Sequence, residues 1–148
     1  MSMIPVGETS ASKIYWHDDE QTILVHLVIQ AWDWETAYQS ISMLNDAVLQ
    51  QVSDVYTIHH LQGLSSLIPK GRNVLMHFRR LVQFDPPNER LVIVVAKSSI
   101  MTTFLKTVFE GALLSGIGSK YRFVGTMDEA FATIREHKST ASAEGSRT

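Results

Sequence analysis

Residues 91–96 read Leu-Val-Ile-Val-Val-Ala, an apolar run without a polar interruption. Such a run is typical of a strand that is covered on both faces of a parallel sheet. A second stretch, Thr22-Ile-Leu-Val-His-Leu-Val-Ile29, is almost wholly apolar and favours another central position. Neither approaches the ~20 apolar residues needed to cross a bilayer. The two stretches therefore predict the centre of a sheet.

Helical patterns alternate with the strands on both sides of this centre. Asp33 is placed to cap a first helix, and Thr126-Met-Asp-Glu129 is a capping box that opens a last one. A third helix is expected from Ser98 or Ser99 to about Gly116. A second helix, stopped by Asp85-Pro-Pro87, carries a single apolar stripe that consists of Val74, Leu75, Phe78, Leu81 and Val82.

Further strands are expected at residues 13–17, 55–61 and 121–124, which gives the order ββαβαβαβα. Alternating strands and helices imply parallel neighbours, because a helix supplies the crossover that parallel strands need. The sequence predicts a single α/β domain with four helices and a mainly parallel five-stranded sheet, whose N-terminal strand is antiparallel. The domain is expected over residues 13–137, after a flexible N-terminus at 1–12 and before a disordered tail at 138–148.

Composition narrows the function classes. The 148 residues include no cysteine, which excludes disulfides, thiolate nucleophiles and thiolate-bound zinc. A net charge of -2 provides no overall field to draw the chain onto nucleic acid. The first residues lack a basic region followed by an apolar core, so we expect no secretory signal and a cytoplasmic protein.

Catalytic and cofactor motifs are absent, and we expect neither an enzyme nor a cofactor. Pro69-Lys-Gly-Arg-Asn73 lacks the spacing of a phosphate-binding loop, and no nucleophile elbow occurs. His59 and His60 are the best candidates for metal or acid–base chemistry. Neighbouring strand residues point to opposite faces, however, so the pair is not expected to chelate one ion. An enzyme that combines either histidine with Asp33 or Asp85 is a weaker alternative.

The second helix predicts a basic surface. With its apolar stripe facing inward, Arg72, Arg79 and Arg80 project away from the core. We interpret this face and the preceding loop as a docking surface for an acidic protein or a phosphate group. The alternative is an ordinary solvated face. The residues expected to bind the partner are Ser65, Ser66, Lys70, Arg72, Asn73, Arg79 and Arg80.

Aromatic and apolar residues suggest two further sites. Trp32, Trp34 and His60 are interpreted as lining a ligand crevice, with core packing and a helix staple as the alternative. The third helix is apolar beyond one narrow face. Its Phe109, Leu113 and Leu114 are either covered within the domain or form a patch for homodimerisation.

The order of elements, the segment from Ile58 to Leu75, the strand at 91–96 and the closing Tyr121-Arg-Phe-Val-Gly-Thr-Met-Asp-Glu-Ala130 resemble the STAS domain. This module occurs in anti-sigma-factor antagonists, and the chain looks most similar to the SpoIIAA-like branch. The resemblance covers about residues 13–137. It implies a regulatory, non-catalytic domain of a bacterial cytoplasm, whose partner is a protein such as an anti-sigma or serine-kinase-like regulator.

The chain departs from that family at its phosphorylated serine. When Gly71 is placed on the glycine of the family's Asp-Ser-Ser-Gly sequence, Pro69 and Lys70 occupy the two serine positions. The resemblance therefore implies the family's docking surface without its phosphorylation switch. STAS domains also look topologically related to the Sec14 lipid-transfer fold, which implies an alternative function in binding a small apolar ligand or a lipid.

Overall fold

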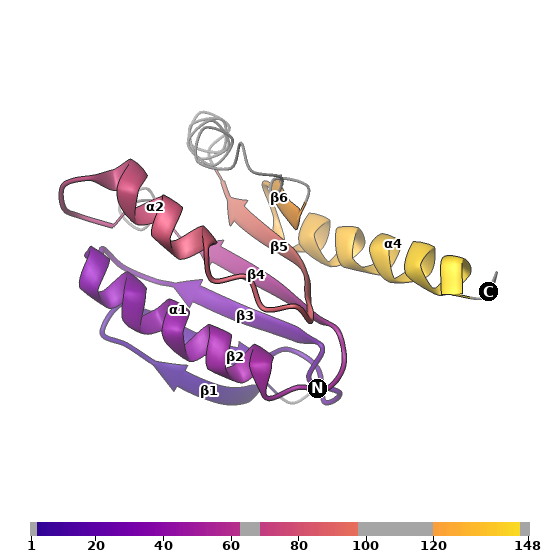
Figure 1. Cartoon of the computed structure of the whole chain (residues 1–148). Coiled ribbons are helices and arrows are strands. Elements are labelled where there is room, and N and C mark those ends of the chain that lie inside the picture. Colours follow the sequence, from indigo (N-terminus) through magenta and orange to yellow (C-terminus); the bar gives the residue numbers. More distant parts are fainter. Residues whose placement is uncertain (1–2, 63–68, 98–119, 146–148) are drawn as a thin grey trace.

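The computed structural model describes residues 3–62, 69–97 and 120–145, which form one mixed sheet with helices on both of its faces (Figure 1). The six strands lie side by side in chain order. β1 and β3 each pair with β2 in the antiparallel sense, and β3, β4, β5 and β6 are parallel. The strands are β1 (Ile4–Glu8), β2 (Ser12–Trp16), β3 (Ile23–Val28), β4 (Val55–Leu61), β5 (Glu89–Ala96) and β6 (Tyr121–Val124).

The described helices are α1 (Trp34–Leu49), α2 (Val74–Val82) and α4 (Met127–Gly145). Figure 1 shows α1 and α2 side by side over one face of the sheet, whereas α4 follows β6 toward the right of the view. α4 contacts β4, β5 and β6. The helix expected at 98–116 lies outside the described residues. None of the three described helices combines the length and the apolar character that crossing a bilayer would require.

Strand alternation separates the core into two sides. Tyr56 and Ile58 of β4 pack with Ala130 and Ile134 of α4. Leu61 packs with Trp34 and Phe78 on the side of α1 and α2. His59 lies two residues before Leu61 in the same strand, so its side chain points to the same face of the sheet. The register between β3 and β4 places His26 beside His59. Both histidines therefore lie beneath α1 and α2.

The α/β class and the parallel part of the sheet are confirmed, but the expected strand number is wrong. Residues 4–8, expected within a flexible N-terminus, form β1 and add a second antiparallel strand. Pro5 and Gly7 obscured this strand, because both residues are poor strand formers. The register shifts between them, and β1 is an edge strand, where proline is tolerated.

The expected caps form at two helices. The Asp33 carboxylate accepts a hydrogen bond from the Thr36 amide at 2.8 Å. At α4 the Thr126 hydroxyl accepts from the Glu129 amide at 3.1 Å, while the Glu129 carboxylate accepts from the Gly125 amide at 3.0 Å. The helix continues to Gly145, whereas the sequence predicted a disordered tail from residue 138. Alanine and serine are tolerated in a helix, so composition alone misplaced this end.

Candidate functional site

The chain enters α2 through a tight turn against the start of α1. The Lys70 amide donates to the Trp32 carbonyl at 2.8 Å, which ties the turn to the residues before α1. Gly71 has a φ of +135°, and a Cβ atom there would lie 2.7 Å from the indole of Trp34. Asn73, the N-cap of α2, has a left-handed φ of 63°. Gly71 is thus required by both conformation and space.

An aromatic cluster anchors α2 to α1. The Trp34 ring stacks on His77 with centroids 4.5 Å apart and meets Phe78 edge-on at 5.3 Å. The Tyr38 hydroxyl and His77 Nδ1 are hydrogen-bonded at 2.8 Å. Trp34 is only 6% exposed. Because these four rings hold the inner side of α2 against α1, the opposite side of α2 faces outward.

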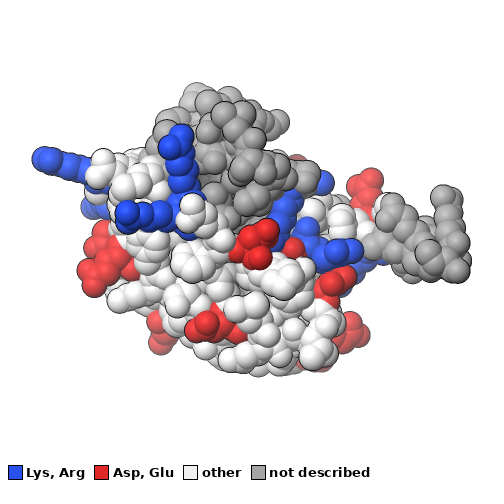
Figure 2. Space-filling view, in the orientation of Figure 1, with Lys and Arg blue, Asp and Glu red and all other residues white. Residues whose placement is uncertain are grey.

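The exposed side of α2 is basic. We name it the α2 surface, and it consists of Lys70, Arg72, Met76, Arg79, Arg80 and Gln83, all exposed. Met76, Arg79, Arg80 and Gln83 recur at three- and four-residue steps and so share one helix face, and Lys70 and Arg72 lie just before the helix. Figure 2 shows Lys and Arg side chains projecting where Figure 1 places α2. In the part of the chain that the structure describes, the ion pairs involve Arg90 and Lys120 and none of these basic residues.

The predicted docking residues are therefore only partly placed. The structure brings Lys70, Arg72, Asn73, Arg79 and Arg80 together as exposed residues at the start and outer face of α2. Ser65 and Ser66 lie outside the described residues, as do Phe109, Leu113 and Leu114 of the expected dimer patch. Within the apolar stripe, Phe78 is buried and Val74 and Leu81 are half-buried. The structure does not describe the side chains of Leu75 and Val82.

A pair of histidines lies in the interior beneath α1. Nδ1 of His26 and Nδ1 of His59 are 2.9 Å apart, so one ring donates its proton to the other. His26 is fully buried, and its ring lies 5.6 Å from that of Trp32. Burial lowers the pKa of His59 to about 4 and lowers the pKa of His26 well below its ordinary value, helped by the charge of His59. Both rings are therefore neutral near neutral pH.

The two tryptophans of the predicted crevice line a cavity, but the histidine that lines it with them is not His60. Trp32, Trp34 and His59 line a cavity of about 90 Å³ between α1, α2 and the strands β4 and β5, which we name the α1–α2 cavity. His60 follows His59 in the strand and so points to the other face of the sheet. There, burial and the nearby Lys97 charge lower its pKa. The structure does not bring His60 together with the two tryptophans.

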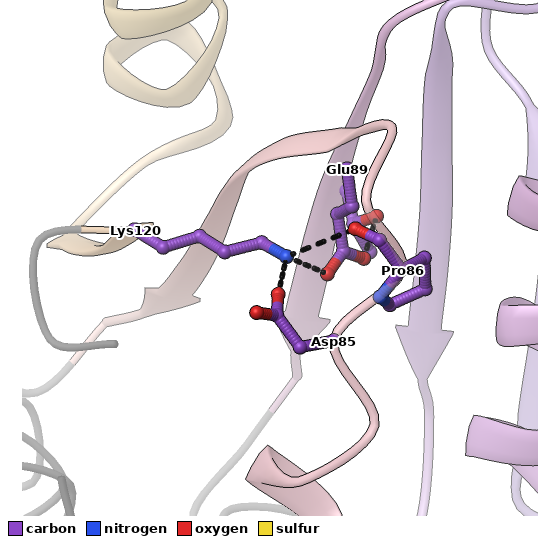
Figure 3. Close-up of polar contacts among 5 residues, drawn as sticks. Asp85, Pro86, Glu89 and Lys120 are labelled. Carbon is purple, nitrogen blue, oxygen red and sulfur yellow. Dashed lines mark hydrogen bonds and ion pairs between the residues drawn. The ribbon is translucent and has the colours of Figure 1, made fainter. Parts of the chain in front are cut away.

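A charged cluster lies at the start of β5 (Figure 3), and its Glu89 and Thr57 line the cavity. Lys120 donates to the Asp85 carboxylate, lies 3.1 Å from Glu89 Oε1 and approaches the Pro86 carbonyl at 3.5 Å. The Thr57 hydroxyl donates to Glu89 Oε2 at 2.7 Å. Burial raises the pKa of Glu89 even though Lys120 and Thr57 oppose that shift. Sequence reasoning missed this cluster, because its members come from three separate segments.

The surroundings of the remaining polar groups determine their protonation and their contacts. Burial and the Glu89 and Asp85 charges raise the pKa of Tyr121, which keeps its phenol protonated. Asp33 caps α1 and Asp85 binds Lys120, so the structure does not show them beside His59 or His60. Within residues 3–62, 69–97 and 120–145, no group of three or more His, Asp or Glu residues is arranged to hold a metal ion.

No protein-family model matches the chain, and no curated protein matches it either. Two features of the chain itself bear on its function. These are the α2 surface, which faces the solvent, and the α1–α2 cavity beneath it.

Proposed function

We propose that this protein is a non-catalytic regulatory module that binds an acidic protein partner through the α2 surface. The observation that carries the proposal is the exposure of Arg72 just before α2 and of Arg79 and Arg80 on its outer face, without an ion-pair partner in the described part of the chain. Arginine forms bidentate bonds to carboxylates and phosphates. Clustered cations also steer an acidic partner during association.

Exposed apolar residues beside the arginines favour a protein over a nucleic acid. Met76 is 38% exposed on the same face, and Phe84, just after α2, is 54% exposed. Arginine, methionine and aromatic residues are enriched at protein interfaces. The net charge of -2 gives no general attraction for a polyanion. The α2 surface therefore combines apolar contact area with directed charge.

The anchoring of α2 lowers the cost of binding. Trp34, His77 and Phe78 fix the helix against α1, so its orientation is set before a partner arrives. Association then costs less ordering entropy than the docking of a flexible segment. On this side of the interface, only the exposed side chains of the α2 surface and Phe84 then have to be immobilised.

The resemblance to the STAS domain suggests the kind of partner. In that family the corresponding loop and helix meet a regulatory protein, and we propose an anti-sigma or serine-kinase-like regulator in a bacterial cytoplasm. Pro69 and Lys70 occupy the positions of the family's serines, and Lys70 is exposed. Since neither residue accepts a phosphate as serine does, we propose a constitutive contact. Homodimerisation through Phe109, Leu113 and Leu114 remains a separate proposal.

The test combines cross-linking with charge reversal. A photoreactive amino acid in place of Met76 captures the partner, and its affinity is then measured by calorimetry. Arg79→Glu with Arg80→Glu should weaken binding at least tenfold, since two charge-assisted bonds are replaced by repulsion. The matched control is Arg135→Glu, which alters an exposed arginine of α4 on the other face of the sheet. Equal affinity in both variants would exclude the α2 surface as the interface.

A second candidate function, the binding of a small ligand, is favoured by the α1–α2 cavity. Its volume of about 90 Å³ is well below the ~300 Å³ at which drug-sized sites begin. A more open depression of about 410 Å³ lies beside α4, but Asp128, Arg135 and Lys138 line it. These dimensions and charges favour a molecule much smaller than a lipid.

A further inference from the structure

The α1–α2 cavity has apolar walls and aromatic corners. Most of its lining side chains are aliphatic or aromatic residues of α1, α2 and the strands below, namely Ala37, Ile41, Leu44, Phe78, Leu81 and Val94. A buried water needs roughly 10–15 Å³ of such space, so about 90 Å³ corresponds to about six to nine water molecules. That space is large for a defect in a packed core. It suits a molecule with one ring.

Three side chains that line the cavity carry a buried donor that has no hydrogen-bond partner among the described residues. These donors are the indole nitrogens of Trp32 and Trp34 and the amide nitrogen of Asn45. All three side chains line the cavity. A buried donor without a partner costs about 1–3 kcal/mol, and native proteins rarely leave one unpaired. Because an indole nitrogen only donates, the missing partner must be an acceptor.

The charges around the cavity define the ligand further. No lysine or arginine is among its described lining residues, and a buried anion without a cation is strongly unfavourable. Glu89 also lines the cavity, but Lys120 and Thr57 already bind its carboxylate. The acceptor of the ligand is therefore an uncharged oxygen. Trp32, Trp34, Phe78 and Tyr121 favour a flat ring beside it.

We propose that the α1–α2 cavity binds an uncharged molecule with one aromatic ring and a carbonyl oxygen that accepts from the indoles of Trp32 and Trp34. The ring lies against Phe78, Leu81 and Val94. This site is separate from the α2 surface and does not depend on a protein partner.

The indoles themselves provide the readout. Protein labelled with ¹⁵N-tryptophan has three indole signals, which belong to Trp16, Trp32 and Trp34. Each is assigned with a Trp→Phe variant. Acetophenone, the probe, should move the Trp32 and Trp34 signals downfield with saturation. Trp16 is the internal control, because it is buried against the other half of α1 and does not line the cavity. Unchanged Trp32 and Trp34 signals at millimolar acetophenone would refute the site.

Two further probes of similar size distinguish the contribution of the carbonyl oxygen to binding from that of the ring. Isopropylbenzene has a similar shape without an acceptor, and it should bind at least tenfold more weakly, because the two hydrogen bonds to the indoles are not made. Benzoate carries a charge and should not bind. Equal affinity of isopropylbenzene and acetophenone would show a merely apolar void and overturn the assignment of the indoles. Tighter binding of benzoate would overturn the assignment of an uncharged ligand.

A cavity-filling variant locates the binding. Ala37 is fully buried and lines the cavity, so Ala37→Leu should abolish the shifts of the Trp32 and Trp34 signals. The control is Ala132→Leu on the exposed side of α4. Arg79→Glu with Arg80→Glu should leave acetophenone binding unchanged, which separates this site from the proposed docking function. If Ala37→Leu does not fold, the three probes still decide the question on the unmodified protein.

Discussion

Acidification should expose the cost of the buried histidine pair. An unfolded histidine has a pKa of about 6.5, whereas burial lowers the pKa of His59 to about 4. The folded protein therefore binds a proton at His59 less readily than the unfolded chain does. The contribution of His59 to stability is fully present above about pH 6.5 and is lost as the pH falls toward about 4.

The magnitude follows from this difference. At about 1.4 kcal/mol per pH unit, His59 should lower the free energy of unfolding by about 2.5 kcal/mol between pH 7.5 and pH 4.5. This is an upper limit, since the His59 side chain is partly accessible beside the cavity. His26, which is fully buried, adds a loss of the same sign. Glu89 opposes both, because a raised carboxyl pKa favours the folded state as the pH falls.

The assay is urea unfolding at pH 7.5, 6.5, 5.5 and 4.5, for the unmodified protein and for His59→Gln. Glutamine keeps a hydrogen-bonding group beside His26 but does not titrate. The difference in free energy of unfolding between the two proteins cancels the carboxyl groups that they share. This difference should shrink by about 2 kcal/mol or more from pH 7.5 to pH 4.5. A difference that stays constant within about 0.5 kcal/mol would refute the buried neutral pair.

Three further substitutions test the framework of the site. Lys120→Met leaves the Glu89 carboxylate buried without its cation and should lower the free energy of unfolding in urea by about 3 kcal/mol. Adding Glu89→Gln should restore at least half of the lost free energy. If the double variant is no more stable than Lys120→Met, the pairing of Lys120 with Glu89 is contradicted. Gly71→Ala should lower the free energy of thermal unfolding by about 2 kcal/mol, because the added Cβ meets Trp34 and the φ of residue 71 is unfavourable for alanine. The control is Gly125→Ala, whose added Cβ has its nearest neighbour at 3.9 Å. It should cost less than half as much. Thr126→Ala removes the cap of α4 and should cost about 1 kcal/mol. Amide hydrogen exchange in the first turn of α4 would measure this loss, and unchanged exchange rates would argue against the cap.

The sequence predicted those features that depend on local pattern. The apolar run at 91–96 became β5, the Asp33 cap opened α1, and the stripe of α2 left Arg79 and Arg80 exposed. Each of these features depends on the periodicity of apolar residues or on a capping side chain at the end of the helix. The first strand was missed because Pro5 and Gly7 oppose strand propensity. There the pairing with β2 prevails over local preference.

The interior of the site was not predictable in the same way. Alternation showed that His59 and His60 face opposite sides of the sheet, but it did not show which face holds the tryptophans. That depends on the side of the sheet on which α1 packs. The contact between His26 and His59 requires the parallel register of β3 and β4. Long-range register of this kind leaves no signature in a single sequence.

The sheet begins with a strand that is poorly suited to receive another. Pro5 lacks a backbone donor, and the register shift between Pro5 and Gly7 bends β1 along its outer side. A neighbouring molecule that approached this side would find an interrupted ladder rather than a continuous template. Crowded chains are thereby discouraged from joining sheet to sheet at β1. Pro5 and Gly7, which made β1 difficult to predict from the sequence, thus also disfavour aggregation at this edge of the sheet.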